Sequence, residues 1–185
     1  MIKSIFWLLL LSSLFSLSAY ANSYKGAVDS NHLSSCNTTD INIIFVLDVG
    51  HAELFLPNCD IFDNSEYMLA ITYNRPFTAD EFIISSDELV SRNNSGDVYN
   101  RIKSDLDKFN SHYQAVEKGD EYRISYTRKY GLSLEKNGDL IASSDNKELA
   151  MAYFKVWFGD NPFHQRMKKN LLNNIKLLPE EKSAT

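Results

Sequence analysis

Apolar residues recur along this chain with the spacings of both strands and helices. Five segments have the apolar runs or the strict alternation typical of β-strands: 41–56, 67–73, 122–126, 132–134 and 140–142. The last two flank Asn137-Gly138, which is the dipeptide favoured in two-residue hairpin turns. The last three segments are therefore predicted to form an antiparallel meander.

Four further segments have the spacing of helices that bury one face: 78–90, 98–113, 146–158 and a final helix with apolar residues at 163, 167, 171 and 175. Thr78 with Glu81, and Asp145 with Glu148, have the spacing of capping boxes at the starts of two of these helices. Pro162 is suited to the first turn of the last helix.

The order of these elements indicates the fold class. Strands come first, followed by two helices, the meander and two more helices, which predicts an α+β fold with helices gathered on one face of an antiparallel sheet. Residues 41–178 contain no internal repeat or linker and are predicted to form one domain. Residues 22–40 are polar and aperiodic, which predicts an irregular lead-in, and residues 179–185 are predicted to fray.

The first 21 residues have the pattern of a secretory signal peptide. Lys3 precedes an apolar run of about a dozen residues, and Ala19-Tyr20-Ala21 supplies a small-residue cleavage site. An uncleaved anchor is the competing interpretation, but a spanning helix needs ~20 apolar residues. We expect cleavage between Ala21 and Asn22, and a periplasmic or secreted mature protein without a membrane span.

Composition and charge narrow the classes of function. The chain has 185 residues with a formal charge of −5, which becomes −6 when Lys3 is removed with the signal peptide. A mildly acidic domain without a basic patch argues against binding of nucleic acid. The four histidines lack metal-ligand spacing, and no Gly-rich phosphate loop or G-x-S-x-G motif occurs. We expect neither a metal ion nor a cofactor.

The two cysteines, Cys36 and Cys59, are expected in an oxidising compartment, where a disulfide would stabilise the fold by about 3 kcal/mol. Two geometries stay open. A single long strand over 41–56 would hold the cysteines apart, whereas a hairpin centred near Asp48 would bring them opposite each other.

Polar and aromatic side chains offer few distinct signals of chemistry. Asp48, His51 and Glu53 lie in one strand segment, but residues 51 and 53 share a face while residue 48 lies on the other. Surface residues are therefore favoured over an acid–base site. Aromatic residues gather in the second half of the chain, at positions 122, 126, 130, 153 and 157. They fit an apolar pocket or an ordinary core, and the core is favoured.

Residues 118–162, KGDEYRISYTRKYGLSLEKNGDLIASSDNKELAMAYFKVWFGDNP, resemble the hallmark region of the bacterial chalcone isomerase-like family. In that family a Lys-Gly-Asp turn leads to a strand pair, an Asn-Gly hairpin and a helix that ends in Ile/Val-Trp-Phe/Leu-Gly. Residues 46–57 and 67–90 are similar to its early strand and to the strand and helix that follow. The resemblance implies an open-faced β-sandwich, in which a large antiparallel sheet packs against a layer of helices with a cleft between them.

The resemblance also implies which positions would carry catalysis. Plant chalcone isomerases close a flavanone ring in an apolar cleft by means of an arginine, a strand threonine, and a helix tyrosine and asparagine. At the matching positions this sequence has Phe82 for the tyrosine, Leu89 for the asparagine and Gly50 for the threonine, and only Lys25 is positive ahead of that strand. Losing one such hydrogen-bond donor costs ~10²–10³ in rate, so the pattern favours a protein without catalysis.

These replacements make Gly50, Phe82 and Leu89 candidate cleft residues for a small lipophilic ligand such as a fatty acid. The leading hypothesis is an exported, non-catalytic domain that binds such a ligand or serves an envelope role. The alternative is an intramolecular lyase or isomerase that acts on a chalcone-like or unsaturated ketone. Its candidate residues are His51, Tyr73 and Arg75. A filled core, or a module that binds another envelope protein, also stays open.

Overall fold

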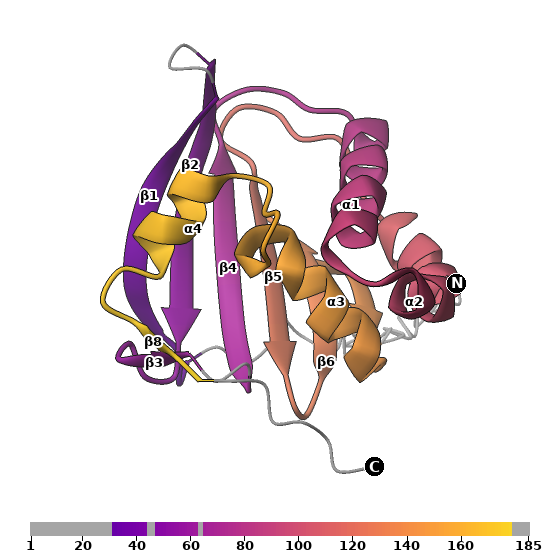
Figure 1. Cartoon of the computed structure of the whole chain (residues 1–185). Coiled ribbons are helices and arrows are strands. Elements are labelled where there is room, and N and C mark those ends of the chain that lie inside the picture. The colour runs from indigo at the N-terminus through magenta and orange to yellow at the C-terminus, as the bar shows by residue number, and fades with distance from the viewer. Residues whose placement is uncertain (1–30, 44–46, 63–64, 179–185) are drawn as a thin grey trace, which may run out of the picture.

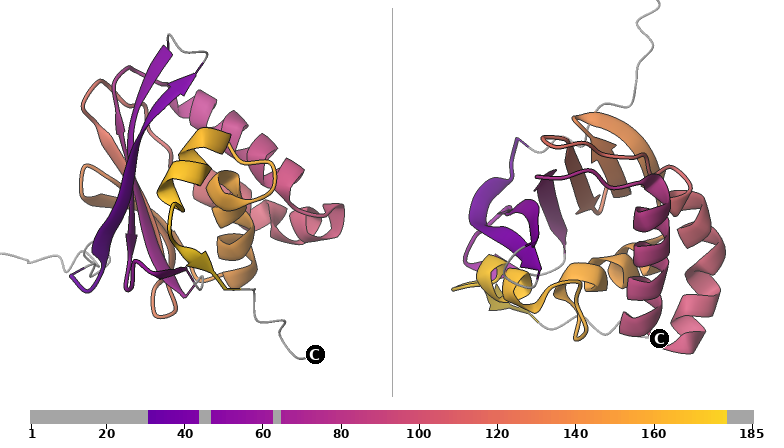
Figure 2. Two further views of the ribbon diagram at one scale, coloured as in Figure 1. Left: turned by 60° about the vertical axis from the view of Figure 1, so that its left-hand side comes forward. Right: turned by 90° about the horizontal axis from the view of Figure 1, so that it is seen from above.

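The computed structural model describes residues 31–43, 47–62 and 65–178. The predicted signal peptide and the tail at 179–185 lie outside these ranges. Within them, six antiparallel strands form one sheet in the order β1-β2-β4-β5-β6-β7. The helices lie on one face of this sheet (Figure 1, Figure 2). The predicted α+β architecture, a large antiparallel sheet packed against a layer of helices, is confirmed.

The strands of the sheet are Ser34–Ile43 (β1), Leu47–Leu56 (β2), Glu66–Tyr73 (β4), Glu121–Thr127 (β5), Gly131–Lys136 (β6) and Asp139–Ser144 (β7). The helices are Ala79–Asn93 (α1), Gly96–Asn110 (α2), Lys147–Phe158 (α3) and Gln165–Leu171 (α4). A short parallel pair, Ile61–Phe62 (β3) and Lys176–Leu177 (β8), joins the segment that follows β2 to the C-terminal end of the described chain. None of the helices in the described ranges is both long and apolar enough to cross a membrane.

The first predicted strand, 41–56, is a hairpin rather than one strand. Strands β1 and β2 pair antiparallel, and Ser34 lies opposite Leu56. Residues 34–40 were predicted as part of an irregular lead-in, and this prediction is wrong because they form most of the edge strand β1. The hairpin is not evident from the sequence, because the three residues between the two strands are Ile-Phe-Val and none of them favours a turn.

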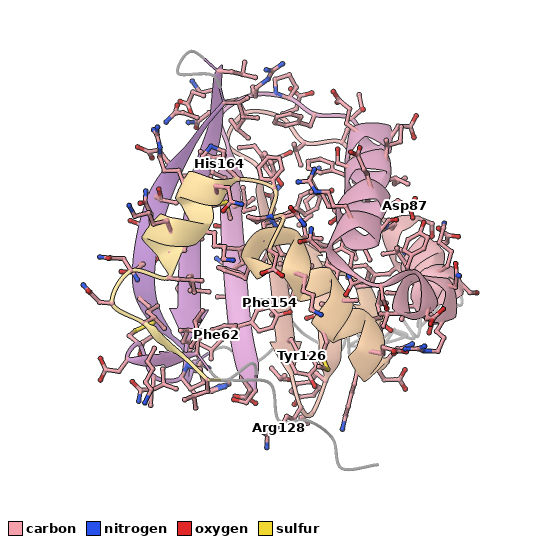
Figure 3. The ribbon with its side chains drawn as sticks, in the orientation of Figure 1. Phe62, Asp87, Tyr126, Arg128, Phe154 and His164 are labelled. Atoms are coloured by element: carbon pink, nitrogen blue, oxygen red, sulfur yellow. A yellow bond between two sulfur atoms is a disulfide. The ribbon has the colours of Figure 1, made fainter. Side chains whose placement is uncertain are left out.

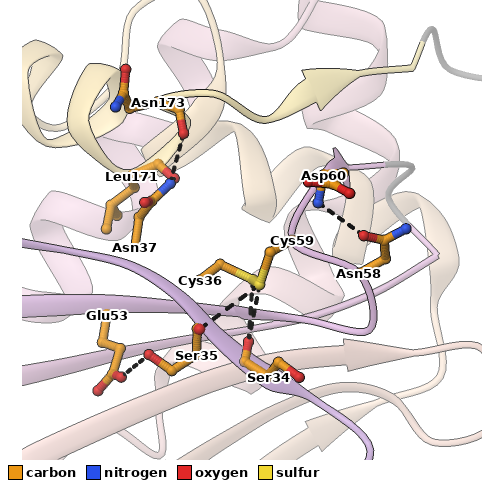
Figure 4. Close-up of a disulfide and its surroundings, with 10 residues drawn as sticks. All are labelled: Ser34, Ser35, Cys36, Asn37, Glu53, Asn58, Cys59, Asp60, Leu171 and Asn173. Atoms are coloured by element: carbon orange, nitrogen blue, oxygen red, sulfur yellow. Dashed lines mark hydrogen bonds between the residues drawn. A yellow bond between two sulfur atoms is a disulfide. The ribbon is translucent and has the colours of Figure 1, made fainter.

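The hairpin brings the two cysteines together. Cys36 and Cys59 form a disulfide with their Cα atoms 5.2 Å apart (Figure 4). A bulge in the pairing between Ser35 and Asn37 leaves Cys36 without a direct partner on β2. The Asn37 amide donates to the carbonyl oxygens at the end of α4, at 2.9 Å each. Of the two geometries left open by the sequence, the structure has the hairpin, with its centre near residue 45 rather than near Asp48.

The helix starts follow local side-chain chemistry. At α1 the Thr78 hydroxyl accepts from the Glu81 N–H at 3.2 Å, and the Glu81 carboxylate accepts from the Thr78 N–H at 2.7 Å, as the predicted capping box requires. The capping box predicted at Asp145 is wrong by one residue. Asn146 caps α3 instead, and its side-chain oxygen accepts from the Leu149 N–H at 3.1 Å.

The last helix is shorter than its apolar spacing predicts. Helix α4 begins at Gln165, directly after its N-cap residue His164, and ends at Leu171. Pro162 therefore precedes the helix instead of forming its first turn. Met167 and Leu171 are buried as expected, whereas Phe163 is exposed ahead of the helix and Ile175 lies beyond its end. Two buried positions were enough to fix a helix of two turns.

The core lies between the sheet and the helices. Four alternate residues of β4 point toward the helices and are buried: Tyr67, Leu69, Ile71 and Tyr73. Helix α2 contributes Ile102, Leu106 and Phe109, which are three of the residues that predicted it. Helices α1 and α3 pack against each other across the same face. The region between α1 and β4 is therefore lined mainly by apolar side chains.

Candidate functional site

A cavity of about 130 Å³ lies between α1, α3 and the first strands of the sheet. Its sheet side is formed by apolar residues of β1, β2 and β4, among them Val49 and Ile71. Its helix side is formed by α1 and α3, including Val156 and Trp157. Glu81 is the one charged side chain among its described lining residues. The cavity is thus largely apolar.

Phe82 and Leu89, two of the predicted cleft residues, line this cavity from two turns of the same face of α1. Gly50, the third, is not among the lining residues. It lies in β2 opposite Tyr73 of β4, with a φ of +156°. A Cβ atom at this position would lie 2.1 Å from the carbonyl oxygen of Thr72, so the close approach of β2 and β4 requires glycine.

A group of aromatic rings surrounds Phe82 at one end of the cavity. Its ring stacks on that of Tyr113, with centroids 5.3 Å apart. It meets Tyr73 and Tyr122 edge to face, at 5.4 Å and 5.2 Å. Edge-to-face and offset stacked pairs are the favoured arrangements of aromatic rings. Phe82 is therefore held in place by the neighbouring rings, and the rest of its side chain faces the cavity.

A hydrogen-bonded cluster of four polar residues, called here the hydroxyl cluster, lies beside these rings. The Tyr153 hydroxyl is at its centre, 2.8 Å from the Ser86 hydroxyl and 2.7 Å from the Tyr113 hydroxyl. The Asn110 side-chain oxygen is an acceptor 3.1 Å from the Ser86 hydroxyl and 3.2 Å from the Tyr153 hydroxyl, and because each hydroxyl has one proton, two of the three contacts within this triangle are hydrogen bonds at any time. Ser86, Tyr113 and Tyr153 line the cavity. The cavity thus has an apolar body and one cluster of neutral hydrogen-bonding groups.

Sequence reasoning missed Ser86 and Asn110 and assigned Tyr153 to the core. A usable signal was present, because Ser86 occupies a position between Phe82 and Leu89 where the buried stripe of α1 predicts an apolar residue. Asn110 likewise follows Phe109 on the buried side of α2, where it is 1% exposed. A polar residue at a buried helix position calls for a partner, and here the partners are each other.

Burial sets the protonation of these groups. Removal from water raises the pKa of Tyr153 to about 12 and raises the pKa of Tyr113 well above its ordinary value. Burial likewise raises the pKa of Tyr73. The N–H of Thr78 lowers the pKa of the Glu81 carboxyl by hydrogen bonding to it. Near neutral pH the tyrosines are therefore neutral hydroxyls rather than bases, and Glu81 is an anion.

Comparison with known proteins identifies the family and the fold that contain this site. A family model described as chalcone isomerase-like matches residues 45–173. The chain belongs to the chalcone isomerase-like family. A crystal structure of a fatty-acid binding protein from Arabidopsis thaliana is similar over 78% of this chain and 88% of that chain, with a TM-score of 0.55 and 11% identity. At that identity the likeness shows the fold alone. A search of curated proteins found no match.

The family resemblance allows the residues that line the cavity to be compared with the catalytic positions that it implies. Phe82 and Leu89 stand where the resemblance implies a catalytic tyrosine and asparagine, and both face the cavity. The hydroxyl cluster is one turn away on α1 at Ser86, and it reaches across to α3 at Tyr153. The polar groups of this cavity therefore occupy other positions than those that the family resemblance implies.

The residues considered for an alternative isomerase do not converge. Tyr73 lines the cavity, but His51 lies on the opposite face of the sheet, since it is paired with Thr72 rather than with Tyr73. The His51 ring contacts the Asp40 carboxylate at 2.9 Å. The Arg75 guanidinium lies over the Phe77 ring, 5.3 Å from its centroid. No group of three or more possible metal ligands occurs within the described residues.

Proposed function

We propose that this chalcone isomerase-like protein binds a small lipophilic molecule, without catalysing a reaction, in the cavity beneath α1. One observation carries the proposal: the side chains at the positions of the implied catalytic tyrosine and asparagine are Phe82 and Leu89, and they line an apolar cavity. The fold is also that of a fatty-acid binding protein, which supports the same class of ligand.

The size of the cavity limits what it holds. Its volume of about 130 Å³ is close to the ~150 Å³ of an engineered apolar cavity that takes up benzene. Pockets for drug-sized ligands are larger, about 300–1,000 Å³. The enclosed part therefore accommodates one ring or a short acyl segment. A longer chain would continue outward past Glu81, Ser85 and Phe163, the exposed residues of the lining.

The chemistry of the lining argues against catalysis. Its tyrosines stay protonated near neutral pH, and the positively charged group that would stabilise a developing oxyanion is not among the described lining residues. We expect the purified protein to leave the ring closure of a chalcone at its uncatalysed rate. An acceleration that disappears in Tyr73→Phe would instead support the isomerase alternative.

We also propose that the protein is exported. The basic residue, apolar run and A-x-A site of residues 1–21 favour a signal peptide. The disulfide between Cys36 and Cys59 supports the same location, since disulfides persist in oxidising compartments. N-terminal sequencing of the protein from the periplasm or medium should begin at Asn22. A protein that keeps Met1 and remains inside the cell would contradict export.

Binding itself is tested by native mass spectrometry of the purified protein, followed by solvent extraction and by titration with the neutral dye Nile red. The dye is larger than the enclosed volume, so one end of it enters the cavity and the rest extends outward past Glu81, Ser85 and Phe163. Leu89→Phe fills the cavity and should weaken dye binding at least tenfold. Ile84→Phe adds the same type of side chain to the exposed side of α1, where Ile84 is 66% exposed, and should leave binding unchanged. If no ligand is extracted and the dye does not bind saturably, the proposed function fails.

A further inference from the structure

The hydroxyl cluster has a hydrogen-bonding capacity that the protein does not fully use. A phenol offers one donor and two acceptor positions. Tyr153 has three partners, namely Ser86, Asn110 and Tyr113, so all of its capacity is used. The Tyr113 hydroxyl, by contrast, has a single partner within the described residues, the Tyr153 hydroxyl at 2.7 Å. Among the residues of the cluster that line the cavity, Tyr113 therefore has the most unused capacity for a ligand group.

Tyr113 can serve either kind of neutral polar group. If it donates to Tyr153, both of its acceptor positions are open to a hydroxyl of the ligand. If it accepts from Tyr153, the single Tyr153 proton is no longer donated to Asn110, and the proton of Tyr113 is open to a carbonyl or ether oxygen; either direction fits the observed distance. Stacking of its ring on Phe82, 5.3 Å away, fixes where the hydroxyl lies. Tyr113 lines the cavity, so a ligand within it reaches this hydroxyl.

The charges around the cavity favour a neutral ligand. No Lys, Arg or His belongs to its described lining, and the one charged side chain, Glu81, is negative. Hydrogen bonding from the Thr78 N–H lowers the pKa of Glu81, which keeps it ionised at neutral pH. A carboxylate within the cavity would lie near a like charge without a cation to pair with. Burying an ion without a partner is strongly unfavourable.

From this arrangement we infer that the ligand is a neutral lipophile whose hydroxyl or carbonyl group hydrogen-bonds to Tyr113, and that the cavity rejects the carboxylate of a free fatty acid. The inference rests on the proposed function, that the cavity binds a lipophile, and it names the chemical class. The apolar part of the ligand lies against Phe82, Leu89 and Val156, and its polar group points toward the hydroxyl cluster.

Arg75 provides the opposing possibility. Its guanidinium lies over the ring of Phe77, which lines the cavity, and its charge contributes to the lowered pKa of Glu81. A fatty acid that entered with its tail first would place its carboxylate outside the cavity, near Arg75. This orientation is the reverse of the one that we infer, so the two are distinguished by head-group preference and by the residue that each needs.

The test is displacement of Nile red from the purified protein by three probes with the same ten-carbon chain: decane, decan-1-ol and decanoate. We expect decan-1-ol to bind about tenfold more tightly than either of the others, since one net hydrogen bond is worth about a factor of ten at most. Tyr113→Phe keeps the ring on Phe82 and should reduce the affinity for decan-1-ol to that for decane. Tyr99→Phe is the matched control, because the Tyr99 hydroxyl donates to Asp87 outside the cavity, at 2.9 Å.

The outcomes separate the inference from the proposed function. Decanoate binding as tight as that of decan-1-ol, lost in Arg75→Gln, would overturn the inference and leave lipophile binding intact. Equal affinities for decane and decan-1-ol, unchanged in Tyr113→Phe, would also overturn it. If none of the three probes displaces the dye, the proposed function fails and the inference fails with it.

Discussion

The face of β4 that packs on the helices has a tyrosine at each end, and the two tyrosines lie in different surroundings. Tyr73 lines the cavity, near Phe82 and Tyr122. We call this the cavity end. Tyr67, six residues earlier on the same face, is packed against Phe154, with ring centroids 4.4 Å apart. We call this the packed end, and Tyr67 is not among the described residues that line the cavity.

The packed end is closed by stacked rings from three elements. Phe62 of β3 stacks on Phe154 of α3 at 4.8 Å, and Phe154 stacks on Phe158 at 4.4 Å. Tyr126 of β5 lies 6.0 Å from Tyr67 on the other side. Figure 3 shows Phe62, Phe154 and Tyr126 in this part of the molecule, below the level of His164. A second cavity of about 250 Å³ borders Phe62, Phe154 and Phe158 on the side away from Tyr67, and charged residues such as Lys155 and Asp160 belong to its lining. The stacked rings thus separate Tyr67 from this more polar cavity.

The two ends differ in what is left incomplete. At the packed end Tyr67 is not among the described residues that line a cavity, but its buried hydroxyl has no hydrogen-bond partner within the described residues. At the cavity end the buried hydroxyls of Ser86 and Tyr153 are partnered, the Asn110 amide nitrogen has no partner within the described residues, and Tyr73 borders about 130 Å³ of open space. Aromatic content alone therefore does not distinguish a pocket from a core. The difference is made by the covering helices: α3 supplies Phe154 and Phe158 at one end, and α1 supplies the small Ser86 at the other.

The largest effect is expected from Phe154→Ala at the packed end. Truncating a buried phenylalanine costs about 3–5 kcal/mol of unfolding free energy, and here it removes stacking on Phe62 and Phe158 and packing on Tyr67. Phe82→Ala should cost less, because Phe82 is half-buried whereas Phe154 is buried. Urea unfolding measures both. Equal losses would contradict the distinction between the two ends.

The disulfide is the next largest contribution, and it belongs to the packed end. Cys59 follows β2, whose Phe55 pairs with Met68 of β4, next to Tyr67. Replacing both cysteines by serine should lower the unfolding free energy by about 3 kcal/mol, as expected for a loop of this length. Affinity for Nile red at the cavity end should stay unchanged when measured below the unfolding transition. A matching loss of affinity would show that the two ends are coupled.

Much of this architecture could be predicted because local patterns decide it. Thr78 and Glu81 fix the start of α1, and Asn137-Gly138 fixes the turn from β6 to β7. The hairpin of β1 and β2 could be given only as one of two geometries, because its connecting segment lacks a turn residue, the end of β1 runs into β2 within the apolar stretch 41–56, and the rest of β1 is polar. Local propensity does not show where such a run folds back.

The site was predictable only in part, for a related reason. Phe82 and Leu89 could be placed on one face of α1 by their spacing and by the family resemblance. Whether that face meets a filled core or open space depends on side chains from α3 and β4, which lie far away in the sequence. Ser86 and Tyr153, 67 residues apart, form a hydrogen bond that no local pattern shows.

A moderate effect is expected from Tyr153→Phe at the cavity end. The change removes the central hydroxyl of the cluster and leaves Ser86 and Tyr113 each without one partner. Loss of a buried partner costs about 1–3 kcal/mol, so unfolding in urea should show a loss in that range. Tyr99→Phe, which removes a hydroxyl outside the cluster, should change stability by no more than about 0.5 kcal/mol. If the two variants lose equally, the cluster is not a stabilising feature.

The smallest effect, of opposite sign, is expected from Tyr67→Phe at the packed end. The Tyr67 hydroxyl is buried without a partner, so its removal eliminates a desolvated polar group and leaves the stacked rings in place. Stability should stay the same or rise by up to about 1 kcal/mol. Tyr67→Phe and Tyr153→Phe make the same chemical change at the two ends, so the difference between the two single variants tests the comparison directly. A loss above 1 kcal/mol for Tyr67→Phe would mean that this hydroxyl has a partner, and the packed end would then resemble the cavity end in its polar groups and differ from it only in volume.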